Sequence, residues 1–432
     1  MKTISYYITL SIILSGLVLN SNAQKTRWLK VESPVSAHLR NLAYADSLTV
    51  WAAGAAGTII KTTNGGLNWE IQNSNVTSFI MDIFFLNKNL GWAVTIKDVP
   101  PFNTQILKTS DGGENWIIEN YPDGNAFMTT IYFLDSLTGF MGGTYIAKTS
   151  NGGITWARMN VDSTLVSNYP VYKFNFYNKS LGYATGGFID QAGVIWRTSD
   201  GGENWTSHGL SPDEIFDIHI KDSLNAIALS GDPEGFYSTG LITTTDAGLT
   251  WEYEELPVYL LSLALDFRTV SEGWSASGYR FLKTTDGGIN WFIEDVPENV
   301  TVYDLEFTDR YHGYAVGESG NILVYIPDPL NINEEEAVPD DFLLYQNYPN
   351  PFNPSTEIKF YLPYDSYVSL SIYNSLGEKI SQLINNELKS GEYRISFSEN
   401  DLSSGVYFYM LRAESNNSKN LFSDTKKMIL IR

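Results

Sequence analysis

The chain has 432 residues with 28 basic and 49 acidic side chains, and its formal net charge of -21 argues against nucleic acid as a partner. It contains no cysteine, which excludes disulfides, thiolate metal sites and cysteine nucleophiles. The 14% of aromatic residues and 35 glycines favour strands and tight turns over helical bundles.

The first 23 residues have the features of a secretory signal peptide. An apolar run over residues 4–19 follows a short basic start and leads to Ser21-Asn22-Ala23, which offers small residues to a signal peptidase. The alternative is a membrane anchor, but the run is shorter than the roughly 20 residues that a bilayer span needs. We therefore expect cleavage before Gln24 and no integral membrane segment in the mature chain.

A box of the form Thr-x-(Asp/Asn)-x-Gly-x-x-Trp recurs six times in the first three quarters of the chain. Successive box tryptophans lie 47, 40, 49, 46 and 40 residues apart, which is the spacing of four-stranded propeller blades. The Asp or Asn can accept backbone N–H bonds in a turn, and the tryptophan can bury its ring at the start of the outer strand. The predicted structural pairs are Asn64 and Trp69, Asp111 and Trp116, Asn151 and Trp156, Asp200 and Trp205, Asp246 and Trp251, and Asp286 and Trp291.

The two ends of the repeat region complement each other. After the sixth box, VYDLEFTD, GYAVGES and NILVYI match three strands of a further unit that has no box, and residues 27–31 resemble the missing outer strand. Joining them predicts seven blades of about 43 residues each and leaves no open sheet edge. The expected fold is all-β, with a seven-bladed β-propeller over residues 24–327.

The last quarter of the chain reads as a second module. Residues 328–341 are acidic and contain prolines without strand periodicity, which predicts a linker. Residues 342–432 contain alternating strands at hairpin spacing, which predicts a small immunoglobulin-like β-sandwich.

The boxes resemble the Asp-box of bacterial neuraminidase repeats, and the unit with GTIIKTTNGG is similar to photosystem II assembly-factor-like propellers. This resemblance implies the propeller fold. The same box occurs in sialidases, xyloglucanases, sortilin-type receptors and noncatalytic propellers, so the resemblance leaves function open.

The C-terminal module resembles the type A sorting domain of type IX secretion. The resemblance is carried by QNYPNPFNP at residues 346–354 and by KKMILIR at the C-terminus. It implies that the secretion machinery is a partner, and that the protein is released from the cell or attached to the exterior of the outer membrane. The alternative is an immunoglobulin-like carbohydrate-binding module.

No catalytic motif is visible in the sequence. A sialidase needs clustered arginines, whereas Arg268 and Arg310 fall in expected hairpin turns. We expect no metal and no cofactor, because the four histidines lack metal-ligand spacing and no phosphate loop is present. A xyloglucanase-like or sialidase-like glycoside hydrolase with carboxylates on the propeller face stays open as the alternative function. The histidines are His38, His208, His219 and His312.

Three units carry long loops between their second and third strands, at residues 95–105, 187–193 and 231–240. In an antiparallel blade these loops open on the face opposite the boxes, and insertions on a rigid scaffold commonly carry function. The leading hypothesis is an exported, noncatalytic propeller that binds a protein or a glycan on this face. The ligand-binding candidates are Asp98, Phe102, Asp190, Asp232, Glu234, Phe236 and Tyr237.

Overall fold

The computed structural model describes residues 27–326, without 101, 163, 233 and 234, and most of residues 342–430. The chain folds into two compact units, Met1–Pro327 and Asp328–Arg432. The predicted signal peptide and linker lie outside the described residues. Within the described residues the structure consists of strands and short 3-10 turns, and none of the helices has the length and apolar character needed to cross a membrane.

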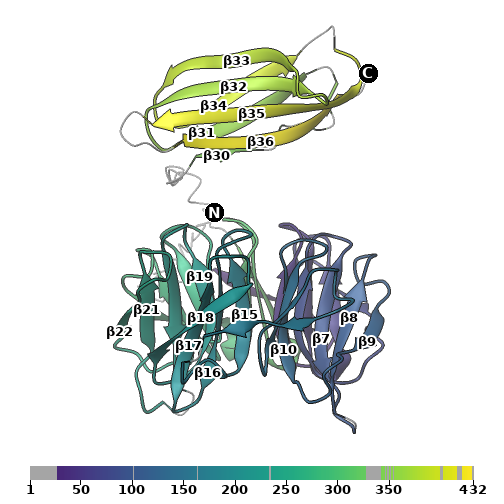
Figure 1. Ribbon diagram of the computed structural model, residues 1–432, viewed down its shortest axis with the longest axis vertical. Coiled ribbons are helices and arrows are strands. Elements are labelled where there is room, and N and C mark those ends of the chain that lie inside the picture. The colour runs from purple at the N-terminus through teal and green to yellow at the C-terminus, as the bar shows by residue number, and fades with distance from the viewer. Residues whose placement is uncertain are drawn as a thin grey trace, which may run out of the picture. The chain divides into compact units, whose positions relative to one another are not determined.

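Seven sheets in residues 28–325, each built around four antiparallel strands, form the blades of a propeller, as predicted (Figure 1). Blades 1 to 3 comprise β2 (Leu39–Tyr44), β3 (Val50–Gly54), β4 (Ile59–Thr62) and β5 (Glu70–Gln72), then β6 (Ile80–Phe85), β7 (Gly91–Ile96), β8 (Thr104–Thr109) and β9 (Ile117–Asn120), then β10 (Met128–Phe133), β11 (Gly139–Gly143), β12 (Ala147–Thr149) and β13 (Ala157–Arg158). Blades 4 and 5 comprise β14 (Asn160–Val161), β15 (Val171–Phe176), β16 (Gly182–Phe188), β17 (Ala192–Thr198) and β18 (Asn204–Ser211), then β19 (Ile215–Ile220), β20 (Ala226–Ser230), β21 (Gly240–Thr244) and β22 (Glu252–Glu255). Blades 6 and 7 comprise β23 (Ala264–Phe267), β24 (Gly273–Ser277), β25 (Arg280–Thr284) and β26 (Phe292–Asp295), then β27 (Val302–Phe307), β28 (Gly313–Gly317), β29 (Ile322–Tyr325) and β1 (Trp28–Val31).

Blade 7 joins the two ends of the propeller chain, as the sequence predicts. Strand β1 pairs antiparallel with β29, with Trp28 opposite Tyr325. The buried Trp28 ring also packs against Trp274, Phe281 and Phe307 of blades 6 and 7. Because the N-terminal strand completes the last sheet, its burial ties both ends of the propeller into one core.

Blade 4 has a fifth strand that the repeat pattern did not predict. The outer strand β13 of blade 3 has only two residues, after which β14 pairs in parallel with β18 of the next blade. The side chain of Asp162 then accepts a hydrogen bond from the backbone N–H of Ser207, at 3.1 Å. The chain between blades 3 and 4 is thereby anchored along the edge of blade 4.

The boxes form one repeated hydrogen-bonded turn between the third and fourth strands of a blade. In blade 4, the Thr198 hydroxyl donates to Asp200 (2.8 Å) and accepts from the Gly202 N–H (2.9 Å), while Asp200 also accepts from the Asn204 N–H (3.1 Å). The same three bonds occur in the other five boxes. The turn also contacts the neighbouring blade, since Lys148 of β12 donates to the Gly201 carbonyl at 2.8 Å. Backbone groups of the turn are therefore satisfied partly by its own Thr and Asp side chains and partly by neighbouring segments.

The C-terminal unit is a β-sandwich, as predicted. One sheet contains β30 (Leu343–Leu344), β31 (Ser355–Leu362) and β34 (Gly391–Ser398), and the other β33 (Lys379–Leu388), β32 (Ser366–Asn374), β35 (Gly405–Ser415) and β36 (Leu421–Leu430). Two residues of the NYPNPFNP motif are built into its core. Phe352 is buried and its N–H donates to the carbonyl of Ile429 at 2.8 Å, and the Asn347 side chain donates to Thr356 at 2.9 Å.

Candidate ligand-binding face and central channel

The innermost strands of the blades surround a central channel. Five of them, β2, β6, β10, β15 and β27, line a cavity of about 370 Å³. Aspartates on the inner strands bridge neighbouring blades: Asp82 accepts the N–H of Ile83 at 2.8 Å and that of Ile131 in the next blade at 2.9 Å. Asp304 makes the equivalent bonds to Leu305 and, across the closure, to Leu42, at 2.9 and 2.7 Å. These carboxylates act as connectors between blades.

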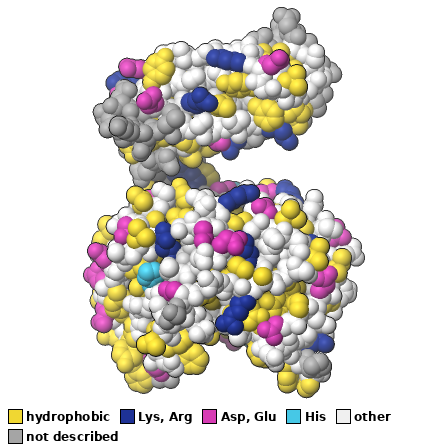
Figure 2. Space-filling model, in the orientation of Figure 1, with side chains coloured by type: hydrophobic (Ala, Val, Ile, Leu, Met, Phe, Trp, Pro, Cys, Tyr) yellow, Lys and Arg dark blue, Asp and Glu magenta, His cyan; other side chains and the backbone are white. Residues whose placement is uncertain are grey.

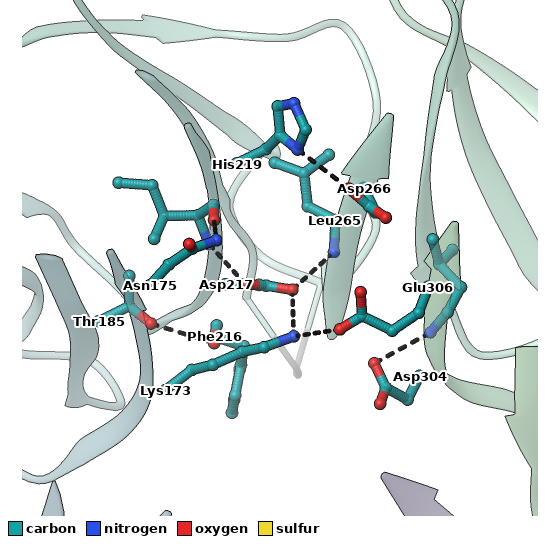
Figure 3. A network of polar contacts seen from close by, with 12 residues as sticks. Lys173, Asn175, Thr185, Phe216, Asp217, His219, Leu265, Asp266, Asp304 and Glu306 are labelled. Atoms are coloured by element: carbon teal, nitrogen blue, oxygen red, sulfur yellow. Dashed lines mark hydrogen bonds and ion pairs between the residues drawn. The ribbon is translucent and has the colours of Figure 1, made fainter. Parts of the chain in front are cut away.

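Lys173 lies among acidic side chains of the same channel, including Asp217, Asp304 and Glu306 (Figure 3). Its ammonium group is 2.8 Å from Asp217 Oδ2 and 3.4 Å from Glu306 Oε1, so it joins blades 4, 5 and 7. Asp217 Oδ2 also accepts the N–H of Leu265 at 3.0 Å. One cation therefore compensates two carboxylates within a polar network.

Burial changes the protonation behaviour of this network. Burial raises the pKa of Asp82 to about 6, despite the hydrogen bonds that it accepts. Burial also raises the pKa of Glu306 well above its usual range, against the opposing effect of Lys173. Burial alone would lower the pKa of Lys173, but Asp217, Glu306 and Asp304 raise it above its usual value. Lys173 is therefore charged at neutral pH.

The remaining titratable groups of interest have structural partners. His219 Nδ1 lies 3.0 Å from Asp266 Oδ1 (Figure 3). Arg268 forms an ion pair with Glu272 and donates to the Arg310 carbonyl at 3.1 Å. Arg268 lies between β23 and β24 and Arg310 between β27 and β28, in hairpin turns as expected. Among the described residues, no group of three or more His, Cys, Asp or Glu side chains could hold a metal ion.

The loops between the second and third strands of each blade open on the same face of the propeller as the loops between blades. We call this the insertion face. The predicted binding residues belong to its loops. Phe102, Phe236 and Tyr237 are exposed there. Asp98 is tied to its own blade, because it accepts a hydrogen bond from the Ser78 hydroxyl at 3.1 Å. Glu234 lies outside the described residues.

Two of the acidic candidates come together between blades 4 and 5. Asp190 has a left-handed backbone (φ 56°), and its N–H donates to the buried Asp213 at 2.9 Å. Burial, together with the charges of Asp232 and Asp190, raises the pKa of Asp213. Asp232 is itself buried and accepts the N–H groups of Phe236 and Tyr237. Asp232 thus holds the loop that presents the two aromatic rings.

An aromatic groove between blades 3 and 4 was not predicted from the sequence. It has a volume of about 560 Å³ on the insertion face. Its rings come from two inter-blade loops, from strand β15 and from the end of strand β16. Only the ring on β16, Phe188, lies within a predicted insertion, at residues 187–193. The signal that could have revealed it is the 49-residue spacing between Trp156 and Trp205, which leaves room for a long inter-blade loop. The residues that define the groove here are Phe127, Thr144, Tyr169, Tyr172, Phe188 and Gln191.

The side of the propeller is a mixed surface on which acidic, basic and apolar side chains are interspersed (Figure 2). The strongest concentration of exposed aromatic rings lies instead on the insertion-face loops. Besides those already named, Tyr259 and Tyr279 are exposed there.

Comparisons with known proteins agree with both halves of this architecture. The family model of photosynthesis system II assembly factor YCF48 matches residues 12–99 and 68–239, and that of the secretion system C-terminal sorting domain matches residues 346–429. No curated protein matches the sequence.

Solved structures show the same propeller fold at low sequence identity. YCF48 bound to D1 peptide is 20% identical, with a TM-score of 0.55, and the match covers 70% of this chain and 98% of that one. YCF48 from Cyanidioschyzon merolae is 18% identical, with a TM-score of 0.54 and coverage of 70% and 99%. The GH74 enzyme of Niastella koreensis is 11% identical, with a TM-score of 0.54 and coverage of 92% and 74%.

The family match identifies the C-terminal module as a sorting domain, not as a carbohydrate-binding module. It indicates secretion to the cell surface or to the outside. The likeness to solved structures shows the fold alone. The chain therefore belongs to the family of photosynthesis system II assembly factor YCF48, and it ends in a secretion system C-terminal sorting domain.

Proposed function

We propose that this exported propeller is a noncatalytic binding protein whose ligand, a protein or a glycan, docks on the insertion face. The observation that carries the proposal is the set of exposed aromatic rings on the loops of that face, including Phe102, Phe236 and Tyr237. Exposed aromatic side chains on rigidly supported loops are typical of binding surfaces. In a related propeller, YCF48, a peptide is bound.

The state of the channel carboxylates supports a noncatalytic role. A glycoside hydrolase needs one carboxyl group as an acid and a second as a base or nucleophile. Asp217 and Glu306 instead share Lys173, and Asp82 bonds to backbone N–H groups of two blades. The similarity to the GH74 enzyme, at 11% sequence identity, is a similarity of fold and is no evidence for the same activity.

The experiment screens the mature protein against surface glycans, polysaccharides and envelope proteins for binding and cleavage together. Serine substitutions at Phe102, Phe236 and Tyr237 should abolish or strongly weaken binding. The matched control replaces the exposed aliphatic residues Leu67 and Ile154 of the box turns by serine. Loss of binding only in the control, or turnover of a bound glycan, would contradict the proposal.

We also propose that export removes residues 1–23 and that a linker over residues 328–341 separates a propeller over 24–327 from the sorting domain over 342–432. The small residues before Gln24 and the sorting-domain match support this processing. Intact-mass analysis of the secreted or surface form should show a chain that begins at Gln24. A chain that still runs from Met1 to Arg432 would refute it.

A further inference from the structure

The groove between blades 3 and 4 is a neutral, aromatic site. None of the residues that line it, all within the described part of the chain, carries a charge. Its volume of about 560 Å³ falls within the roughly 300–1,000 Å³ range of small-ligand pockets. The lack of charge stands out on a chain whose net charge is -21.

Hydrogen bonds hold the segments that carry the rings of the groove. The Tyr169 hydroxyl donates to Gln191 Oε1 at 2.9 Å, and the Tyr169 ring lies 6.2 Å from that of Phe188. The Phe127 backbone N–H donates to the Thr144 hydroxyl at 2.9 Å. The Phe127–Thr144 bond fixes the blade 3 wall of the groove, and the Tyr169–Gln191 bond fixes the blade 4 wall. Both walls are therefore ordered before a ligand binds.

The inner end of the groove is also aromatic. Tyr172 stacks on Phe216 of the next blade, with ring centroids 5.2 Å apart, and its hydroxyl donates to the Gly187 carbonyl at 3.3 Å. Burial, helped by the charge of Glu214, raises the pKa of Tyr172 to about 12. The phenol therefore keeps its proton at neutral pH and remains a neutral hydrogen-bonding group.

We propose that this groove binds an uncharged oligosaccharide segment of a glycan. Sugar rings present C–H faces that can lie on Phe127, Tyr169 and Phe188, while their hydroxyls both donate and accept hydrogen bonds. The NH2 group of Gln191 can donate to these hydroxyls, and the Thr144 oxygen, which already bonds to the Phe127 backbone, has a second lone pair that can accept. Neutral groups of this kind match sugar hydroxyls better than a fixed charge would. The acidic propeller repels an anionic glycan, and a basic peptide would find no carboxylate in the groove.

This inference rests on the proposed function and names the ligand class for one part of the insertion face.

The full secreted chain is titrated by calorimetry with uncharged hexasaccharides of glucose, mannose and N-acetylglucosamine, and with hexagalacturonate as the anionic probe. We expect binding of at least one uncharged probe and none of hexagalacturonate. Phe188→Ala should weaken binding about tenfold, because one stacking ring is lost. Tyr169→Phe keeps the ring and should weaken it less.

The matched control is Tyr177→Ala, which removes an equally exposed ring of blade 4 from the turn between β15 and β16, on the opposite, box face. It should leave the affinity unchanged, and thermal melts should show that all three variants are folded. Equal binding by Phe188→Ala and the parent protein would overturn the groove assignment. Failure of all uncharged probes would overturn the ligand class. If an envelope protein then bound in a Phe102- and Phe236-dependent manner, the proposed function would stand without this inference.

Discussion

The box face and the insertion face of the propeller are built from the same strands but follow different rules. On the box face, six turns repeat the same three internal hydrogen bonds, as in the turn at Thr198. On the insertion face, loops differ in length from blade to blade and expose rings such as Phe102 and Phe236. Repetition therefore marks the scaffold, and irregularity marks the face on which we propose that a ligand binds.

The largest effect that would test this contrast is on stability. Trp205→Ala should lower the free energy of unfolding by about 3–5 kcal/mol, because a fully buried ring leaves a cavity among Phe140, Phe174 and Phe176. Trp156→Ala is the matched variant: it has the same indole bond to its box glycine carbonyl but is less buried, so its loss should be smaller. Unchanged melting of Trp205→Ala together with lost binding would reverse the roles of the two faces.

The channel should behave as part of the scaffold. Lys173→Met should cost about 2 kcal/mol at pH 8, because it leaves Asp217 and Glu306 without their shared cation, and the partial exposure of Lys173 keeps the loss below that of a fully buried pair. Burial raises the folded-state pKa of Glu306 above its unfolded value, so its contribution to stability is complete at low pH and is lost as the pH rises. The deficit of the variant should therefore shrink at pH 5, as measured by denaturant melts.

The control for the channel is the exposed pair of Lys179 and Asp135. Lys179→Met should change stability by less than about 1 kcal/mol at either pH, since solvent screens exposed pairs. A deficit of Lys173→Met that grows at pH 5 would contradict the assignment of the network.

The box threonine offers an intermediate effect. Thr198→Val keeps the side-chain shape but leaves the Gly202 N–H without its acceptor, which should cost about 1–3 kcal/mol. Thr206→Val, at an exposed position on the neighbouring strand, should be close to neutral. If chemical denaturation gave equal values for both, the box hydrogen bonds would be dispensable.

The smallest effect on stability belongs to the insertion face. Phe236→Ala removes an exposed ring and should change the free energy of unfolding by less than about 0.5 kcal/mol. Its effect should appear in ligand affinity once the ligand of the screen is known. A destabilisation comparable to that of Thr198→Val would show that this loop is part of the scaffold.

The fold was predictable because a repeated motif can be recognised by comparing the sequence with itself. Six boxes at blade spacing and an unpaired strand at each end predicted the seven blades and the closure through Trp28, both of which the structure confirms. The sorting-domain motif predicted the C-terminal module in the same way, and the family match confirms it. The box turns and the strands of a blade depend on hydrogen bonds and pairing between residues close in sequence, so short stretches of sequence are enough to predict them.

The tertiary structure decided which side chains meet. Lys173, Asp217 and Glu306 are far apart in the sequence, and only the closed ring of blades brings them to one channel. Likewise, Tyr169 and Phe188 form a groove because the loop after blade 3 lies beside that of blade 4. The sequence by itself determined the blades, since each is specified by its own strands and turns. The channel charges and the aromatic groove arise between blades, where residues from separate repeats come together without a shared sequence pattern.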